Sequence, residues 1–324
     1  MGYGQEGHIG ISFQDSYGSS NVDSMDYFKF ISESITENIE SLMSESLSSR
    51  LEEPDDYEGM HGIEGDVVLE VHPNMIGKLL NAWTGQYSQD TYVGSCYSHL
   101  FLPRTDDFDE EVCALQPMTV EIYRDTGSAY LYFDMLMNQL AFEISQGALY
   151  KCTASFIGAC FSWSNKTSPS YESGSFFAWD TVSLSLAGTG ISYASELTIT
   201  LNNNLEAKAF LDGKKTPGRI LRTDYRTIEV AGTMLLVGDT EARNYRNRTQ
   251  QRFIVTATDP TTIMNGHNQL QIDIPKMLYT EFPANIGGPG LIEVGFSAKG
   301  KYDTTSSYAV QFTLVNTTAD YTSV

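Results

Sequence analysis

The chain has 324 residues, of which 41% are hydrophobic, and its formal net charge at pH 7 is −21. This length and composition are those of a globular protein with one or two domains. The negative charge argues against a free-standing nucleic-acid binder, because phosphate binding requires an excess of cationic side chains. No apolar run approaches the roughly 20 residues of a membrane-spanning helix. The opening MGYGQEGHIG lacks the features of a signal peptide, so we expect synthesis in a cytoplasm.

The charge is unevenly distributed along the chain. Residues 1–180 carry 28 acidic and 7 basic side chains, whereas residues 181–324 carry 13 of each. Ten of the later basic residues fall between Lys208 and Arg252. Acidity alone can serve to keep a protein soluble. The alternative is that the acidic half of one chain contacts the basic segment of another copy.

The N-terminal third begins with polar, flexible-looking sequence. Residues 1–27 are rich in Gly, Ser, Asp and Tyr, and they predict an arm that needs a partner to become ordered. A strand is indicated from Phe28 to Ile31. Residues Ser32 to Glu58 are acidic with alternating apolar positions, which predicts an extended strand leading into a solvated loop. A helix over Ser32 to Leu51 is the alternative, because Glu, Leu, Ser and Met tolerate one.

Between His61 and Gly85 the sequence predicts a strand that runs directly into a short helix. Period-two alternation indicates the strand, with Val67, Leu69 and Val71 on one face and Val68, Glu70 and His72 on the other. Pro73 ends the strand because it has no amide hydrogen to donate. Asn74 to Trp83 then place apolar side chains at helical spacing, and Gly85 follows as a stop signal.

Further strands alternate with turn-forming sequence along the rest of the chain. Turn signals such as Arg124-Asp125-Thr126-Gly127 separate the predicted strands, which are Tyr92–Leu102, Met118–Tyr123, Tyr130–Phe142, Ala148–Ser162, Thr181–Ala187 and Glu196–Leu201. The Ser/Pro/Gly-rich run from Ser164 to Gly174 is the best linker candidate. The segment DGKKTPGRI, residues 212–220, predicts a loop before the next strand.

Two blocks of sequence repeat in the same order. Thr227 to Asn247 matches the strand and helix described above, with Val67-Val68-Leu69 aligned to Met234-Leu235-Leu236. Later, Leu149–Gly158 aligns with Leu291–Gly300. The repeat predicts a mainly β chain built by tandem duplication. Its expected parts are an N-terminal arm over 1–27, a first unit over 28–163, a linker over 164–180 and a second unit over 181–324.

Searches for catalytic or metal-binding patterns give negative results. The histidines and cysteines show no zinc spacing, and the cysteines are expected to be small buried residues, with disulfides as the less favoured alternative. These residues are His8, His61, His72, His99, His267, Cys96, Cys113, Cys152 and Cys160. Gly287 to Gly290 contains Pro289, which has no amide for a phosphate, so a turn is expected. The acidic cluster Asp106–Glu111 lacks the glycine and spacing of a calcium loop. We therefore predict no enzyme, no metal and no cofactor.

The order of several segments resembles the major tail tube proteins of long-tailed bacteriophages. The resemblance covers roughly Gly7 to Gly300 and rests on the stretches ISESITENIESLMSESL, GIEGDVVLEVHPNMIGKLLNAWTG, ELTITLNNNLEA, IEVAGTMLLV, IDIPKM and GPGLIEVGFSAKG. It implies β-sandwich or barrel-like units, each with a short flanking helix and a long loop. It also implies a virion protein whose rings stack into a DNA-conducting tail tube beside other tail proteins. One departure is the second helix, Asp239–Arg248, which is far more polar than Asn74–Trp83.

The duplication leads to an expectation about ring size. If each chain carries two copies of a unit that otherwise forms six-membered rings, three chains close a pseudo-hexameric ring. Six whole chains per ring is the alternative. Closing a sheet between chains protects strand edges. An acidic channel wall repels DNA phosphates, so DNA passes through the lumen without specific binding.

The uneven charge identifies candidate assembly residues. We expect the acidic segment of one chain to pack against the basic stretch of a neighbour, and the residues singled out are Glu52, Glu53, Asp56, Arg219, Arg222 and Arg226. Because a single exposed ion pair contributes only about 0–1 kcal/mol, the effect requires many pairs repeated around a ring. A solvated acidic loop without a partner is the alternative.

Two other function classes remain possible at this point. A carbohydrate-binding or adhesive β-sandwich module is the first, because aromatic residues such as Trp163, Tyr171 and Trp179 can stack on sugars. A hydrolase whose site is not recognisable in the sequence is the second. Rings or tubes in electron micrographs distinguish a tail tube protein from both.

Overall fold

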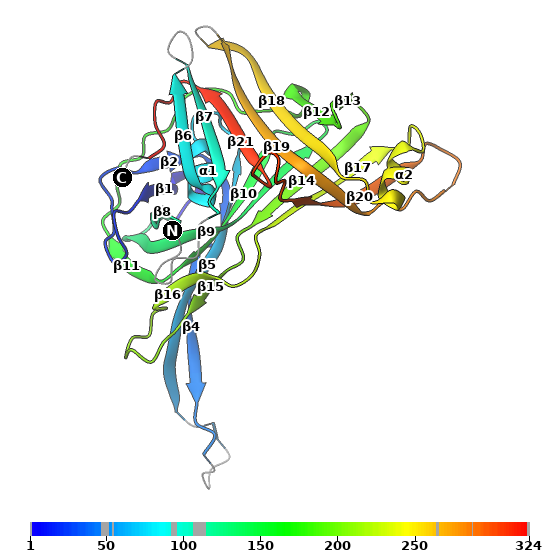
Figure 1. Ribbon diagram of the computed structural model, residues 1–324. Coiled ribbons are helices and arrows are strands. Elements are labelled where there is room, and N and C mark those ends of the chain that lie inside the picture. Colours follow the sequence, from blue (N-terminus) through cyan, green and yellow to red (C-terminus); the bar gives the residue numbers. More distant parts are fainter. Residues whose placement is uncertain are drawn as a thin grey trace.

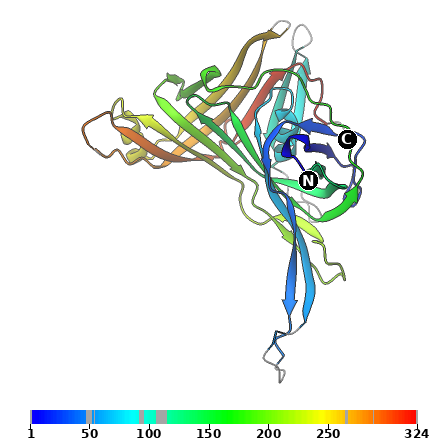
Figure 2. The same ribbon diagram turned by 180° about the vertical axis from the view of Figure 1, so that it is seen from behind.

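The computed structural model describes residues 2–46, 52–53, 55–91, 96–105, 115–263, 266–286 and 288–322. Within these residues the chain is mainly β, and most strands join one extensive antiparallel sheet system (Figure 1). No sheet in the described part of the chain closes into a barrel. A long hairpin projects from the body of the molecule in both views (Figures 1 and 2). The prediction of a mainly β fold with short helices is confirmed.

The elements of the first half alternate short and long strands around one helix. In chain order they are η1 (Gly4–Glu6), β1 (His8–Phe13), β2 (Asp26–Phe28), β3 (Phe30–Glu33), β4 (Thr36–Met43), β5 (Asp56–Glu70), α1 (Ile76–Thr84), β6 (Gly85–Thr91), β7 (Tyr97–Pro103), β8 (Met118–Tyr123), β9 (Ala129–Ser145), β10 (Lys151–Gly158) and β11 (Cys160–Ser164). The projecting hairpin is formed by β4 and the first part of β5.

The second half repeats this alternation. Its elements are η2 (Trp179–Thr181), β12 (Val182–Leu186), β13 (Thr189–Ile191), β14 (Ala194–Asn202), β15 (Leu205–Lys208), β16 (Arg219–Arg222), β17 (Thr227–Leu235), α2 (Thr240–Asn247), β18 (Gln251–Ile263), β19 (Gly266–Glu281), β20 (Glu293–Lys301) and β21 (Gln311–Asn316). As in the first half, a helix follows the strand that the sequence repeat identified.

The two halves share one order of strand pairing. In the first half β1 pairs with β2 and β8, β8 with β9, β9 with β10 and β11, and β10 with β5. In the second half β12 pairs with β13 and β18, β18 with β19, β19 with β20 and β21, and β20 with β17. The outer partners also correspond, because β3 and β4 pair with β5 as β14 pairs with β17. This shared connectivity is what a tandem duplication predicts.

A β-bulge provides a residue-level match between the halves. On β9 the extra residue that faces no partner in β10 is Asn138, and on β19 the extra residue opposite β20 is Thr280. Gln139 and Glu281, each directly after its bulge, are therefore equivalent. The match agrees with the sequence alignment of Leu149–Gly158 on Leu291–Gly300.

The alignment of the two strands before the helices needs a correction. Those strands end at Glu70 and Leu235, so their ends place Leu69, rather than Val67, over Met234. The shift of two residues preserves which side chains face inward, because alternate residues of a strand share a face. Both Leu69 and Met234 are buried, at 3% exposed each.

The two halves meet inside the chain through a continuous sheet. β14 lies between β17 of its own half and β9 of the first half, and its residues Glu196–Asn202 pair with Gln139–Ser145. Beyond the end of β14, the Asn203 side chain donates hydrogen bonds to the carbonyl oxygens of Trp83 (3.1 Å) and Met137 (3.0 Å). We refer to this contact between β9, α1 and β14 as the internal junction.

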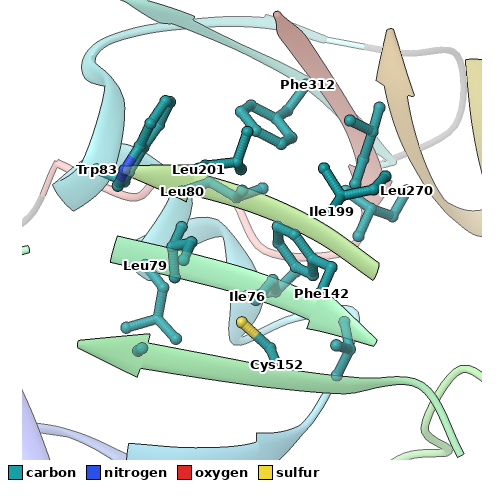
Figure 3. Packing of buried hydrophobic residues seen from close by; sticks show 14 of the residues in the cluster. Ile76, Leu79, Leu80, Trp83, Phe142, Cys152, Ile199, Leu201, Leu270 and Phe312 are labelled. Atoms are coloured by element: carbon teal, nitrogen blue, oxygen red, sulfur yellow. The ribbon is translucent and has the colours of Figure 1, made fainter. Parts of the chain in front are cut away.

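Helix α1 is part of the core. All nine of its residues are buried, and Gly85 ends it in the left-handed conformation at φ 71°. Figure 3 shows Trp83 and Phe312 side by side, with ring centroids 6.3 Å apart. The helix packs together with side chains from both halves of the chain, including Phe142, Cys152, Ile199, Leu201, Leu270 and Phe312. One hydrophobic core therefore spans the internal junction.

Helix α2 occupies the equivalent place in the second half but has no buried residue. Its sequence, TEARNYRN, supplies few apolar side chains, and only Ala242 packs against the main core. The left-handed residue that ends α2 is Arg248. The predicted second helix is present, and its polar composition leaves it on the surface.

The N-terminal arm and the region after it depart from expectation. Residues 1–27 were expected to need a partner, but His8–Phe13 form β1 between β2 and β8, and all six residues are buried. Alternation of apolar side chains with glycine and serine lets both faces of β1 pack closely. The alternative helix over Ser32 to Leu51 is wrong where the chain is described, because Phe30–Glu33 and Thr36–Met43 are strands.

Two further boundaries are also corrected. The predicted loop over residues 212–220 ends inside a strand, because Arg219 and Ile220 belong to β16 and pair with β15. The predicted strand over Ala148–Ser162 is in fact two strands, β10 and β11, with a break at Ala159. Both pair with β9. Residues 92–95 of the strand expected from Tyr92 lie outside the described residues.

Candidate assembly surfaces

The hairpin of β4 and β5 is the most isolated surface of the molecule (Figure 2). Large apolar side chains on it are exposed, namely Ile39 (50%), Leu42 (48%), Met43 (59%) and Tyr57 (62%). Among its described residues the acidic side chains are Glu37, Glu40, Glu45, Glu52, Glu53, Asp55, Asp56, Glu58 and Glu64. A projecting hairpin that combines exposed apolar and acidic groups has the character of a contact surface.

A charged cluster lies where the hairpin leaves the body of the protein. His61 Nδ1 is 2.8 Å from Glu37 Oε1, and His61 Nε2 is 2.7 Å from Glu58 Oε1. The hydrogen bond to Glu37 is the main reason that the pKa of His61 is raised. Lys215, from the loop between β15 and β16, pairs with Glu58, and this contact lowers the pKa of the Glu58 carboxyl. The acidic hairpin and the basic loop therefore already touch within one chain.

The acidic residues predicted from the sequence are on the surface. Glu52 and Glu53 are exposed near the tip of the hairpin, although residues 47–51 and 54 around them lie outside the described residues. Asp56 is the exposed first residue of β5, and its carboxylate accepts a hydrogen bond from the Ser41 hydroxyl. All three side chains are accessible to a neighbouring molecule.

The predicted arginines divide into two groups. Arg219 is exposed on β16. Arg222 and Arg226 instead converge on Asn203, donating to its Oδ1 over 3.0 and 2.8 Å. Arg226 also donates to the carbonyl of Arg104 over 3.2 Å, and its guanidinium lies 5.3 Å from the Trp83 ring centroid. These two arginines stabilise the internal junction of their own chain.

Sequence reasoning missed this role for Arg222 and Arg226. The basic stretch gave no local signal that distinguishes them from Arg219, because their partner Asn203 lies beyond the end of another strand, β14. The nearest signal was the run Asn202-Asn203-Asn204, which marks the end of β14. Carbonyl groups in the last turn of a helix have no partner within the helix, and Asn203 satisfies one of them by donating to the Trp83 carbonyl.

Two sheet edges, one in each half of the chain, are candidates for pairing between chains. No described strand pairs with the outer edge of β3 and β4, whose other edge pairs with β5. On β19, the strand β18 reaches only as far as Met277, so on that side Leu278–Glu281 has no partner strand in the described part of the chain. Pro283 follows shortly afterwards and lacks an amide to extend the pairing.

Helix α2 presents the most basic exposed segment near the β19 edge. Arg243 pairs with Asp239 on the preceding turn, with Nη2 and Oδ2 2.6 Å apart. Arg246 and Arg248 are exposed at the C-terminal end of the helix. Cations at a helix C-terminus are favoured by the helix dipole. The second half therefore offers a positive surface beside an unpaired strand.

The described residues contain no group of three or more His, Cys, Asp or Glu side chains placed to hold a metal. The acidic cluster Asp106–Glu111, considered as a possible cation loop, lies outside the described residues. Cys96, Cys152 and Cys160 are free thiols, and Cys113 is also outside the described residues. None of the helices described is both long enough and apolar enough to cross a bilayer.

The aromatic residues considered for sugar stacking lie on three different segments. Trp163 on β11 is 61% exposed and packs against Tyr130, with ring centroids 4.6 Å apart. Trp179 belongs to η2, and Tyr171 forms an isolated bridge with Tyr27. Their placement does not assemble one aromatic platform.

Comparison with protein families gives one match to nearly the whole chain. The family model described as phage tail tube protein matches residues 4–313. Comparison with curated proteins gives no match.

Proposed function

The chain belongs to the phage tail tube protein family, and on this premise we propose that it assembles into stacked rings whose channel conducts DNA. The protein is a structural component of the virion tail, not an enzyme, and it assembles with other tail proteins into an oligomeric tube. The observation that carries the ring proposal is the pair of unpaired sheet edges on a duplicated β fold. Natural β proteins protect such edges, and pairing between copies is one way to do so.

We propose a ring of three chains with pseudo-sixfold symmetry. Each chain then contributes two units, residues 28–163 and 181–324, joined by the linker over 164–180. The matched pairing of β1 with β8 and β12 with β18 supports extending the first unit back to residue 8. Because the two free edges differ, contacts between chains are head to tail and close into a ring when the rotation permits.

The charge of the protein suits passage of DNA. With a net charge of −21, a channel wall that carries part of the acidic excess repels phosphates, so that DNA moves through without specific binding. We further propose that the chain is made in the cytoplasm of the bacterial host before assembly.

We also propose that acidic and basic surfaces meet between chains. Of the residues selected from the sequence, Glu52, Glu53, Asp56 and Arg219 are exposed in positions a neighbour can reach. Arg222 and Arg226 serve their own chain through Asn203 and are less suitable contacts. Many weak pairs repeated around a ring provide the stabilisation that a single exposed pair cannot.

Electron microscopy of the purified protein tests the ring proposal. The expected result is rings or tubes whose averaged end views show three chains arranged with pseudo-sixfold symmetry. End views with six whole chains would replace the trimer by the hexamer. Monodisperse single chains at every concentration and salt condition tested would overturn ring formation.

A further inference from the structure

The internal junction is a structural template for a contact between chains. At this junction the end of β14 pairs with β9 directly after the bulge, with Asn202 opposite Gln139. The next residue, Asn203, is fully buried and donates a hydrogen bond to the Trp83 carbonyl at the C-terminal end of α1. A strand of one half thus joins both the sheet and the helix of the other half.

The repeat identifies which residues of the two free edges correspond to this contact. Asn202 pairs with Thr227, eight residues before the last residue of β17, and Asn38 pairs with Gly62, eight residues before the last residue of β5. Asn38 on the outer edge of β4 therefore corresponds to Asn202. The bulges make Glu281 on β19 the counterpart of Gln139.

We propose that copies of the chain join head to tail by repeating the internal junction, with the outer edge of β4 added to the free end of β19 in the next copy. Asn38 of one chain then lies opposite Glu281 of its neighbour. This inference rests on the proposed ring assembly and specifies its interface. The partner is a second copy of this chain, because the surface to be matched is the counterpart of one that the chain already binds internally.

The free edge of β4 is exposed where its counterpart in the internal junction is buried, as the proposed contact requires. Ile39 follows Asn38 as Asn203 follows Asn202, yet Ile39 is 50% exposed whereas Asn203 is fully buried. The outer edge of β4 has no partner strand among the described residues. Pairing with a neighbouring copy covers Ile39 and supplies the missing strand.

Charge complementarity supports the same contact. The left-handed residues that end the two helices are Gly85 and Arg248, so Arg246 of α2 stands where Trp83 stands in α1. At the internal junction the residues beside Trp83 are Asn203 and Arg226. In the hairpin the residues that correspond to these two are Ile39 and His61, and Glu37, Glu40 and Glu58 lie beside them. Acidic side chains of one copy thereby face the basic end of α2 in the next.

Disulfide trapping tests the proposed pair. The variant Asn38→Cys/Glu281→Cys is assembled, oxidised with copper phenanthroline in air, denatured and run on a non-reducing gel. Residues directly opposite on paired strands place their Cβ atoms within about 4.5–5.5 Å, close to the separation that a disulfide requires. The expected products are covalent dimers and closed covalent trimers, whereas a variant that carries only one of the two substitutions remains monomeric.

A matched control is provided by the internal junction itself. In Asn202→Cys/Gln139→Cys the same reaction links two residues of one chain, so the product stays monomeric and migrates as a more compact band. Tubes of the Asn38→Cys/Glu281→Cys variant that give only monomers on the gel would overturn the proposed junction and leave ring assembly standing. Failure of the wild-type protein to form rings or tubes would overturn both.

Discussion

Helices α1 and α2 follow equivalent strands, yet one lies in the core and the other on the surface. Every residue of α1 is buried, and no residue of α2 is. The difference follows from what covers each helix. α1 is covered by β6, β7 and β9 of its own half and by residues of the second half, among them Asn203, Phe312 and Tyr321. After α2 the chain passes directly into β18, so no described hairpin takes the place of β6 and β7 over this helix.

The cover over α1 is specific at the level of single atoms. Gly77 lies against the ring of Tyr321, where an added Cβ would come within 2.4 Å of the ring carbon Cε2. Asn81 donates to the Tyr321 carbonyl over 2.9 Å. Asn316 at the end of β21 donates to the Tyr321 hydroxyl over 2.6 Å and to the Pro73 carbonyl over 2.8 Å. The comparison teaches that one helix uses intrachain packing while the other is available for a neighbour.

The largest expected effect comes from reversing charge on the uncovered helix. The double substitution Arg246→Glu/Arg248→Glu should abolish tube formation while the single chain stays folded, because it sets acidic groups against the acidic hairpin of the next copy. Assembly is checked by electron microscopy and sedimentation, and folding by circular dichroism. Adding Glu37→Lys and Glu40→Lys to the same chain should restore part of the assembly.

A control with the same change of charge uses β15, β16 and the loop between them, which we call the basic hairpin. Lys214→Glu/Arg219→Glu alters exposed residues of β16 and its loop, outside the proposed junction. Tubes should still form with this variant, because any exposed ion pair that Arg219 makes with a neighbour contributes only about 0–1 kcal/mol. If Lys214→Glu/Arg219→Glu blocks assembly and the α2 variant does not, the neighbour binds the basic hairpin. That outcome would support the contact at Arg219 that the sequence predicts.

The next largest effect concerns the stability of the single chain. Trp83→Ala should lower the free energy of unfolding by about 3–5 kcal/mol, because it removes a fully buried aromatic ring and leaves a cavity. Tyr245→Ala on α2 should change it by no more than about 0.5 kcal/mol, because that side chain is 38% exposed. Urea denaturation of both variants measures the difference. Equal losses would show that α2 is as well packed as α1.

Much of this contrast is readable from the sequence. The strand into the helix near Trp83, its repeat near Thr227 and the polar character of the second helix all follow from periodicity and composition, because these are local properties. The internal junction does not, since Asn203, Arg226 and Trp83 meet only after distant strands pair. For the same reason, the sequence alone predicts that Arg222 and Arg226 bind a neighbouring chain.

The buried β1 shows a second limit of local reasoning. Its sequence, HIGISF, lies in a segment whose Gly, Ser and Asp content predicts an arm. The strand is stabilised by pairing along its whole length with β8, which is more than one hundred residues later in the chain. A composition average over residues 1–27 therefore concealed a short strand with a distant partner.

A smaller effect is expected at the contact between α1 and the C-terminal segment. Gly77→Ala should destabilise the chain by about 1–3 kcal/mol, because the new methyl group overlaps the Tyr321 ring. Alanine favours a helix over glycine by about 1 kcal/mol, so a net loss requires that the overlap outweigh this gain. Urea denaturation measures the loss. Stabilisation by Gly77→Ala would show that the C-terminal segment is not packed on α1.

A double variant separates this contact from a general effect on the helix. If the overlap with Tyr321 is the cause, Gly77→Ala/Tyr321→Ala should be less destabilised than the sum of the two single variants, since the second change removes the clash. Additive losses would instead show that the loss from Gly77→Ala does not come from the overlap with the Tyr321 ring. Gly62→Ala, where nothing lies within 4 Å of the added Cβ, should be close to neutral.

The smallest effect expected is on the pH dependence of stability. It has opposite signs for His99, beside α1, and for His61, in the hairpin of β4 and β5. His99 Nδ1 lies 2.9 Å from the Tyr87 hydroxyl, and Nε2 lies 3.1 Å from Asn316 Oδ1 and 3.0 Å from the Thr318 carbonyl, contacts that suit a neutral ring. Burial lowers the pKa of His99 from its ordinary value of 6.5, whereas the bond to Glu37 raises the pKa of His61.

The directions of these pKa shifts determine how the stability contribution of each histidine changes with pH. A lowered folded-state pKa means that the contribution of His99 is present above pH 6.5 and is lost as the pH falls below it. The raised pKa of His61 means that its contribution is full below pH 6.5 and is lost as the pH rises through the folded value. Nuclear magnetic resonance titration should place His99 below and His61 above 6.5. In urea denaturation, His99→Gln should remove part of the loss of stability on acidification, and His61→Gln part of the loss on raising the pH. If both rings titrate at the ordinary value, neither is held by the contacts described, and the cover of α1 is looser than its burial indicates.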